Sequence, residues 1–361
     1  MRRAKRWFAI YRRLILIAAI ALAAAPGTFV RTNIDPDPQA VAITVTPIAD
    51  RGGVTGDLSI SGAWEISATH PFFGGFSALV EVPNMAGGPD AHTDAHTEPN
   101  TGLLAGSDRG WSLDIPLIAG EPAEAGAQFV YFAKRRDSFL EMVDLEAMAR
   151  DPETGTLWTS YEGFNAVQRD ALDGTSTRRA PEQMRGWSAN SGPEAMVRLA
   201  DGSFIILAEA PDDTGGPNRP GLLFAGDPIE EGTPIKFQIS TPPKYSPVDA
   251  AALPDGSVLI LLRRVQISVP AAFDAAIMRA DPGEIRPGEV WTGEVIANLD
   301  GPIFGENFEG IAFVPNPKGT PGGETSDGSG AIYLISDDNL SMFQRNLLVR
   351  LDWPGQIGTA N

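Results

Sequence analysis

The chain has 361 residues, with 46 acidic and 28 basic side chains, a formal net charge of −18 and no cysteine. The absence of cysteine excludes disulfide frameworks, thiolate-ligated metal centres and a cysteine nucleophile. A net negative surface repels phosphate backbones, so generic nucleic-acid binding is not expected. The 39 glycines and 30 prolines indicate many turns between short elements rather than long helices.

The N-terminal segment 1–25 has the pattern of a signal peptide. Six basic side chains and no acidic one precede an apolar run from Leu14 to Ala25. This run is shorter than the roughly 20 apolar residues that a membrane span needs. We therefore expect cleavage and export to the periplasm or the exterior, with no membrane span in the mature chain. An uncleaved N-terminal anchor is the alternative, and the pair Arg12-Arg13 also allows twin-arginine export.

A repeat follows, in which a carboxylate precedes small and apolar residues and then a β-rich run. Its copies centre on Glu146, Glu194, Asp249 and Glu309, with a divergent copy at Ser77. The differences between successive positions are 69, 48, 55 and 60, with a mean of 58. Each copy is followed by a second apolar run and further short β-like segments. A unit of about four strands that recurs in this way is typical of a β-propeller blade.

The segment 57–353 has room for about five such units, so we predict an all-β, five-bladed propeller with a linker over 26–56 and a tail over 354–361. The last unit supplies strands at 310–315, 331–336 and 346–352, and then the chain ends. Its outer strand is expected from residues 58–67, which would close the ring and remove open sheet edges. Six blades are the alternative, because the long interval between the first two copies has room for a weak blade.

The ordered motifs GGFSALV, DLEAMA, GPEAMV, DAAALPDGSVLILLRR, NFEGIAF and IYLISDDN resemble those of the phytase-like family, described as "esterase-like activity of phytase". The resemblance covers roughly residues 57–353. It implies a propeller fold and a secreted or periplasmic location, and it implies little about the reaction, because one fold hosts many activities.

Antiparallel pairing places the start of an innermost strand and the end of the next strand at the same mouth of the central channel. The residues predicted to meet there are Glu146 with Glu162, Glu194 with Glu209, Glu309 with Asp337 and Asp338, Asp108 with Arg109, and Asp249 with Arg263 and Arg264. So many carboxylates cannot all stay ionised side by side without cations or ion pairing.

Two interpretations of this mouth follow. In the first, oxygen ligands hold Ca²⁺ and guanidinium groups bind an anionic small-molecule ester. The expected metal ligands are Asp108, Glu162, Glu209, Asp337 and Asp338, and the expected substrate-binding residues are Arg109, Arg263 and Arg264. In the second, repeated carboxylates accept backbone N–H groups of neighbouring blades and lock the ring. Repetition assigns that role, or metal ligation, to Glu146, Glu194, Asp249 and Glu309.

The sequence has no GxSxG, HExxH or GxxxxGK[ST] motif, so serine-esterase, zincin and P-loop chemistry lack support. The function predicted is therefore an exported, calcium-dependent hydrolase of phosphate or other esters, without a covalent Ser, Cys or His nucleophile and with no catalytic residue assigned. The alternative is a non-catalytic periplasmic propeller that binds a ligand or a protein at its channel mouth.

Overall fold

The computed structural model describes residues 41–49, 53–83, 101–131, 144–211, 217–230, 232–266, 272–316, 328–339, 341 and 343–355. The expected signal peptide lies outside these residues. Within the described part of the chain, no helix has the length and apolar character needed to span a bilayer.

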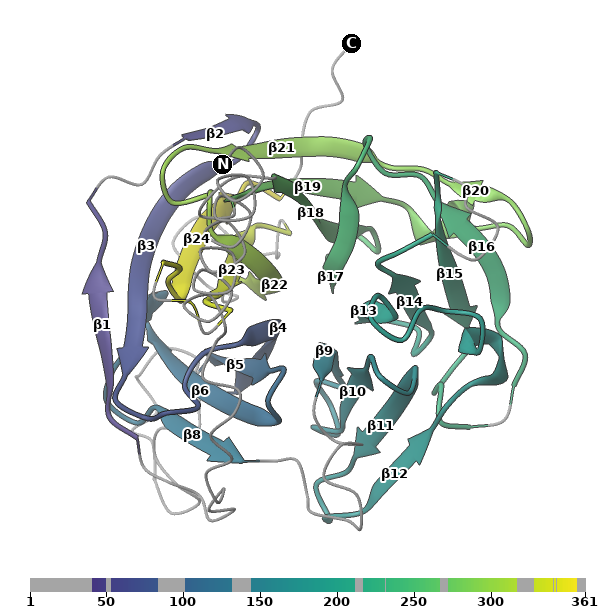
Figure 1. Ribbon diagram of the computed structural model, residues 1–361, viewed down its shortest axis with the longest axis horizontal. Coiled ribbons are helices and arrows are strands. Elements are labelled where there is room, and N and C mark those ends of the chain that lie inside the picture. Colours follow the sequence, from purple (N-terminus) through teal and green to yellow (C-terminus); the bar gives the residue numbers. More distant parts are fainter. Residues whose placement is uncertain are drawn as a thin grey trace, which may run out of the picture. The chain divides into compact units, whose positions relative to one another are not determined.

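The structure is all-β, with five sheets arranged around one axis (Figure 1). Blade 1 consists of β4 (Phe76–Pro83), β5 (Thr101–Ser107), β6 (Trp111–Ile118), β7 (Glu121–Pro122) and β8 (Gln128–Tyr131). Blade 2 consists of β9 (Leu145–Arg150), β10 (Leu157–Tyr161), β11 (Ala166–Asp170) and β12 (Ser176–Arg179). Blade 3 consists of β13 (Pro193–Arg198), β14 (Phe204–Ala208), β15 (Arg219–Phe224), β16 (Ile235–Ile239) and β20 (Val290–Trp291).

Blades 4 and 5 each recruit strands from the N-terminal end. Blade 4 consists of β17 (Ser246–Ala252), β18 (Val258–Gln266), β19 (Ala272–Ala280), β21 (Glu294–Asp300) and β2 (Gly53–Gly56). Blade 5 consists of β22 (Asn307–Pro315), β23 (Gly330–Asp337), β24 (Leu347–Trp353), β3 (Ser59–Ala68) and β1 (Ile43–Pro47). In the described residues, the helices are the 3₁₀ turns η2 (Glu182–Met184) and η3 (Pro282–Glu284).

Each blade places one strand at the axis, namely β4, β9, β13, β17 and β22, and each of these packs against the next, with β22 closing against β4 (Figure 1). The prediction of five blades is therefore confirmed, and the six-bladed alternative is not. The core is distributed between adjacent sheets. Between blades 4 and 5, for example, Leu259 and Ile277 of one sheet join Leu334 and Val349 of the other, all fully buried.

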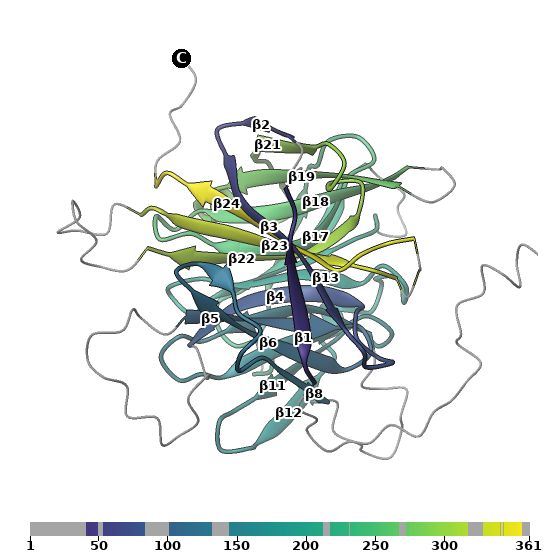
Figure 2. The same cartoon turned by 90° about the vertical axis from the view of Figure 1, so that its left-hand side faces the viewer.

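The predicted closure by the N-terminal segment is also confirmed. Strand β3 pairs antiparallel with β24, and β1 adds a further strand outside β3 (Figure 2). In addition, β2 pairs with β21 of blade 4. Strands β1 and β2 lie in the segment 26–56 that the sequence indicated as a linker, so the propeller begins earlier than expected. Pairing these strands satisfies backbone groups that would otherwise form open sheet edges.

A β-bulge interrupts all five axial strands at the same place, near their N-terminal ends. At each bulge one residue has no partner on the second strand, and these residues are Ser77, Glu146, Glu194, Val248 and Glu309. A bulge re-aims the side chain that it carries. In three blades it presents a glutamate at one mouth of the channel. In blade 4 the bulged residue is Val248, so the expected equivalence of Asp249 with the three glutamates is shifted by one residue.

Candidate functional site

An acidic cluster occupies the mouth where the axial strands begin. We call it the acidic mouth, and its carboxyl groups are those of Asp108, Asp144, Glu146, Glu162, Glu194, Glu209, Glu309, Asp337 and Asp338, with the guanidinium groups of Arg109 and Arg263. These nine carboxyls and two guanidiniums interact by charge across all five blades, and their formal charge when fully ionised is −7.

Three carboxyl groups at the centre of the cluster come close enough to share one cation. Carboxylate oxygens of Asp144, Glu146 and Glu162 all lie within 4.8 Å of one another. Calcium binds oxygen ligands at about 2.3–2.6 Å, so two ligands of one ion are at most about 5 Å apart. The predicted proximity of Glu146 and Glu162 is thus observed, and the donor set fits a hard divalent cation.

Asp144 was not among the residues singled out from the sequence. Its backbone connects two blades, because its N–H donates to the carbonyl of Asp108 at 2.6 Å and its own carbonyl accepts from the N–H of Glu162 at 3.1 Å. It has a positive φ of 82°, a conformation that Asp tolerates better than most residues. The signal in the sequence was its position immediately before LEAMA, the copy of the repeat that contains Glu146.

Protons are shared within the cluster. Burial raises the pKa of Glu162 to about 7, although a side-chain hydrogen bond with Glu194 acts in the opposite direction. Burial, followed by the charges of Glu209 and Glu162, holds the pKa of Glu194 well above its ordinary value. Two carboxyl groups that hydrogen-bond to each other hold one proton between them. The pair Glu162–Glu194 therefore carries a proton near neutral pH.

Glu146 lies between this pair and blade 1. Burial and then the charges of Glu194 and Glu162 raise its pKa well above the ordinary value. Its side chain keeps some access to solvent, as expected for a group that faces a narrow channel. A cation at this position would offset the repulsion that now favours protonation.

Arg263 connects three blades at one side of the mouth. Its guanidinium forms an ion pair with Glu209 of blade 3 at 2.8 Å and a second ion pair with Glu309 of blade 5. It also donates to the Asn307 side chain at 2.8 Å. Arg264, the neighbouring residue, pairs instead with Asp274 and lies over the Tyr245 ring at 4.9 Å. Of the two adjacent arginines predicted to bind an anion, only Arg263 contacts the acidic mouth.

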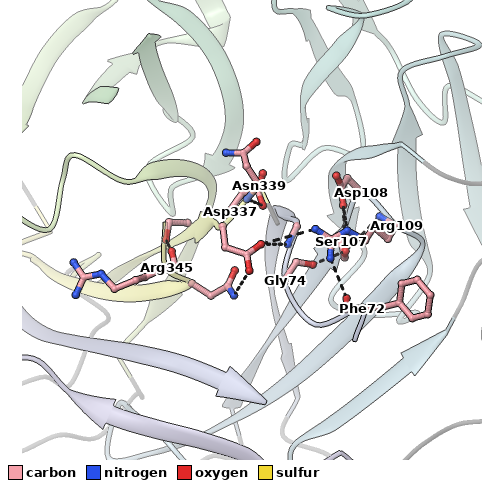
Figure 3. Close-up of polar contacts among 12 residues, drawn as sticks. Phe72, Gly74, Ser107, Asp108, Arg109, Asp337, Asn339 and Arg345 are labelled. Atoms are coloured by element: carbon pink, nitrogen blue, oxygen red, sulfur yellow. Dashed lines mark hydrogen bonds and ion pairs between the residues drawn. The ribbon is translucent and has the colours of Figure 1, made fainter. Parts of the chain in front are cut away.

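Arg109 lies between blades 1 and 5. It lies 3.6 Å from Asp108 and 3.9 Å from Asp338, and it contacts the carbonyl of Phe72 (Figure 3). Burial raises the pKa of Asp108 to about 6. Burial and then the charge of Asp108 raise the pKa of Asp337 to about 7. Asp337 and Asp338 thus interact by charge with Asp108 and Arg109 of blade 1; their predicted proximity to Glu309 stays a prediction.

The turn before β4 leaves room for these groups. Gly74 and Gly75 have positive φ values of 114° and 69°. A Cβ atom at Gly74 would overlap the Asp338 carboxylate, and one at Gly75 would overlap the Asp108 carboxylate. The two glycines are therefore required both by the backbone conformation and by the close approach of charged side chains.

Asp249 lies deeper, one position after the bulge, where the other blades have Ala or Gly. It is completely buried. Its carboxylate accepts backbone N–H groups of Ala250 and Ile311, each at 2.8 Å, and of Leu79. Burial raises its pKa, while these three donors act in the opposite direction. The geometry is that of the ring-locking interpretation.

Five antiparallel sheets around an axis, closed by N-terminal strands, define a five-bladed β-propeller, and the site is a carboxylate-rich channel mouth. The chain belongs to the phytase-like family, described as "esterase-like activity of phytase", whose model matches residues 71–340. The resemblance noted in the sequence is therefore confirmed. No curated protein is significantly similar to the chain in sequence.

Three of the solved structures that match this chain have low sequence identity to it. A gluconolactonase of Xanthomonas campestris has 10% identity and a TM-score of 0.41, over 87% of this chain and 100% of its own. Virginiamycin B lyase of Staphylococcus aureus has 14% identity and a TM-score of 0.37, over 86% and 99%. Hydrazine synthase of Kuenenia stuttgartiensis has 13% identity and a TM-score of 0.35, over 73% of this chain and 63% of its own.

Proposed function

We propose that the protein is a calcium-dependent hydrolase of an anionic small-molecule ester, with the acidic mouth as its active site. The observation that supports the proposal is the convergence of Asp144, Glu146 and Glu162 oxygens within 4.8 Å of one another. These three residues would hold the cation. A bound divalent cation polarises an ester oxygen and lowers the pKa of a coordinated water.

Other side chains of the acidic mouth would transfer protons and set the local charge. The Glu162–Glu194 pair holds one proton with a pKa of about 7 for Glu162, so it can accept or donate a proton near neutrality. The mouth has a formal charge of −7 when fully ionised, and these residues alone repel an anionic ester. Ester binding is therefore expected to need calcium.

The test combines calorimetric titration of calcium with an assay of the metal-stripped protein on phosphate monoesters and carboxylic esters. Glu162→Gln and Asp144→Asn should each weaken calcium binding at least about tenfold, and chelator should abolish turnover. Glu182→Gln is the matched control, because Glu182 lies in an exposed turn and pairs with the nearby Arg185. Calcium binding that is absent, or unchanged in Glu162→Gln, would contradict the proposal.

A second function, a non-catalytic binding propeller, is favoured by one observation. Among the described residues, the two arginines that reach the mouth are already ion-paired, Arg109 with Asp108 and Asp338, and Arg263 with Glu209 and Glu309. An anionic ester would have to displace these partners. Saturable calcium binding without turnover on either class of ester would support this second function over hydrolysis.

Export to the periplasm or the exterior is part of the proposal and rests on the basic and apolar segment 1–25. Fractionation with mass measurement of the N-terminus checks it. A chain that keeps this segment and stays in the cytoplasm would contradict it.

A further inference from the structure

The opposite end of the channel contains a cavity of about 180 Å³ that the proposed function does not use. All five axial strands line it through the residues that lie two, three and four positions after the bulge. Two residues of extended chain span about 7 Å and four span about 13 Å. The lining of the cavity therefore lies about 7–13 Å from the bulged residues along the strands.

Asp249 lies between the two ends. Its carboxylate bonds to backbone N–H groups of β17, β22 and β4 one position after the bulge. Asp249 and the residues at the same position of the other axial strands, Ala78, Ala147, Ala195 and Gly310, are all buried, so this layer is closed on its channel side. The cavity is thus a separate compartment and not an extension of the acidic mouth.

The floor of the cavity is apolar. Met148, Met196 and Ile311 contribute to it, and Phe313 lies at the rim. An enclosed cavity of about 150 Å³ lined by apolar side chains binds a benzene ring, so this cavity of about 180 Å³, which is open to solvent on one side, has room for a ring of that size. Methionine sulfur atoms also make favourable contacts with aromatic rings. Size and lining together therefore fit one aromatic ring or an aliphatic group of similar volume.

The rim carries charge on three neighbouring strands. The residues four positions after the bulge are Glu81 on β4, Arg150 on β9 and Arg198 on β13. Arg198 contacts Asp151 through one nitrogen at 3.4 Å. Among the described residues, Arg150 has no side-chain hydrogen bond or ion pair, and it acts on Glu81 through its charge alone.

A guanidinium group with open donors at the rim of an apolar cavity is suited to a carboxylate, which it can bind through two parallel hydrogen bonds. Burial raises the pKa of Glu81, and the charge of Arg150 acts in the opposite direction. Among the described residues no hydrogen bond or ion pair joins the two side chains, so the donors of Arg150 stay open to an added carboxylate. A single guanidinium without a hydrogen-bonded partner neutralises one negative charge. A monocarboxylate is therefore a better match for it than a phosphate dianion is.

We propose that this cavity is a second ligand site, which binds a small monocarboxylate with an apolar body, its carboxylate on Arg150 and its body on the methionine-lined floor. The proposal is independent of calcium binding and of ester hydrolysis at the acidic mouth.

The experiment is a calorimetric titration of the full chain with benzoate, in chelator and again with calcium. We expect saturable binding that is the same in both buffers. Arg150→Gln should weaken it about tenfold or more, because a charge-assisted pair is lost. The matched control, Arg185→Gln, changes an arginine whose side chain is 78% exposed and should bind benzoate as the parent does.

Ala252→Leu provides a test that leaves the charges in place. Ala252 lines the cavity, so a larger side chain there should reduce binding by occupying the space of the ring. Benzylamine, which has a similar body and the opposite charge, should not bind. No benzoate binding, equal weakening in Arg150→Gln and Arg185→Gln, full binding in Ala252→Leu, or equal binding of benzylamine would each overturn the proposal.

Discussion

Asp249 shows how one residue can hold several blades together. Its carboxylate accepts N–H groups from three of the five axial strands and is fully buried. Asp249→Asn keeps the size but replaces one acceptor oxygen with an NH₂ donor, which faces backbone donors. A buried group without a partner costs about 1–3 kcal/mol. We expect that loss in the free energy of unfolding, measured by denaturant titration.

The control for this substitution is Asp173→Asn, in an exposed turn between β11 and β12 where the side chain accepts from Thr175. It should leave the denaturation midpoint unchanged. Equal midpoints for the two variants would show that Asp249 does not lock the ring.

The raised pKa values of the acidic mouth predict a pH dependence of stability. Burial, followed by the charges of neighbouring carboxylates, raises the pKa of Asp337 to about 7, and burial raises that of Glu162 to about 7. The folded protein therefore holds protons that the unfolded chain releases, between about pH 4 and pH 7. Stability from these groups is present below this window and is lost as the pH rises through it.

Calorimetry in chelator should give a lower Tm at pH 8 than at pH 5, and Glu162→Gln should show a smaller decrease than the parent. Calcium should raise the Tm more at pH 8, where the carboxyls are ionised. Glu182→Gln should keep the slope of the parent. A Glu162→Gln slope equal to that of the parent would contradict the assignment of the pH dependence to this cluster.

Among the structural elements, the turn before β4 offers the sharpest comparison. Gly75 has a φ of 69° and lies against the Asp108 carboxylate, whereas Gly174 has a φ of 83° and nothing within 4 Å. Alanine at either position has a strained backbone, at a cost of about 1–2 kcal/mol. Only Gly75→Ala also displaces Asp108. It should therefore destabilise the protein more than Gly174→Ala and weaken calcium binding, as titration calorimetry would measure.

The sequence pattern predicted the repeated blades correctly. It did not predict which single residue of each axial strand is left unpaired at the bulge. The spacing of Glu146, Glu194 and Glu309 predicted the blades. Antiparallel pairing predicted that Glu162 lies close to Glu146, as it does in the structure. The bulge in β17 falls at Val248, and a repeat pattern does not reveal which of two adjacent residues is left unpaired. Asp144 was missed because its place depends on a left-handed backbone conformation.

The sequence pattern also did not predict which ion pairs form at the acidic mouth. Arg263 forms ion pairs with Glu209 and Glu309 of two other blades, whereas Arg264 forms an ion pair with Asp274 of its own blade. Adjacent residues of a strand point to opposite faces. The register of β18 with β17 determines which of the two arginine side chains points to the acidic mouth. The repeat pattern in the sequence does not specify this register.

At the scale of the whole molecule, ring closure depends on the N-terminal strands. Strand β3 pairs with β24 along most of its length. A chain that begins at Val41 keeps β1, β2 and β3, and it should be as stable as the full chain. A chain that begins at Ala68 leaves β24 as an open edge, and such edges promote aggregation. We expect it to aggregate or unfold, as size-exclusion chromatography and circular dichroism would detect. A monomeric, folded product would contradict this dependence.

The same closure has a consequence for the order of folding. The Ser61 hydroxyl donates to the carbonyl of Arg350, and these residues are 289 positions apart. Contacts of such long sequence separation form slowly, because the entropy of closing the intervening chain is lost before the contact is gained. During synthesis β1 can pair with one edge of β3, but the other edge of β3 has no partner until β24 of the last blade has emerged. Completion of blade 5 is therefore the step that joins the two ends of the chain, and before it the nascent propeller exposes strand edges to other chains.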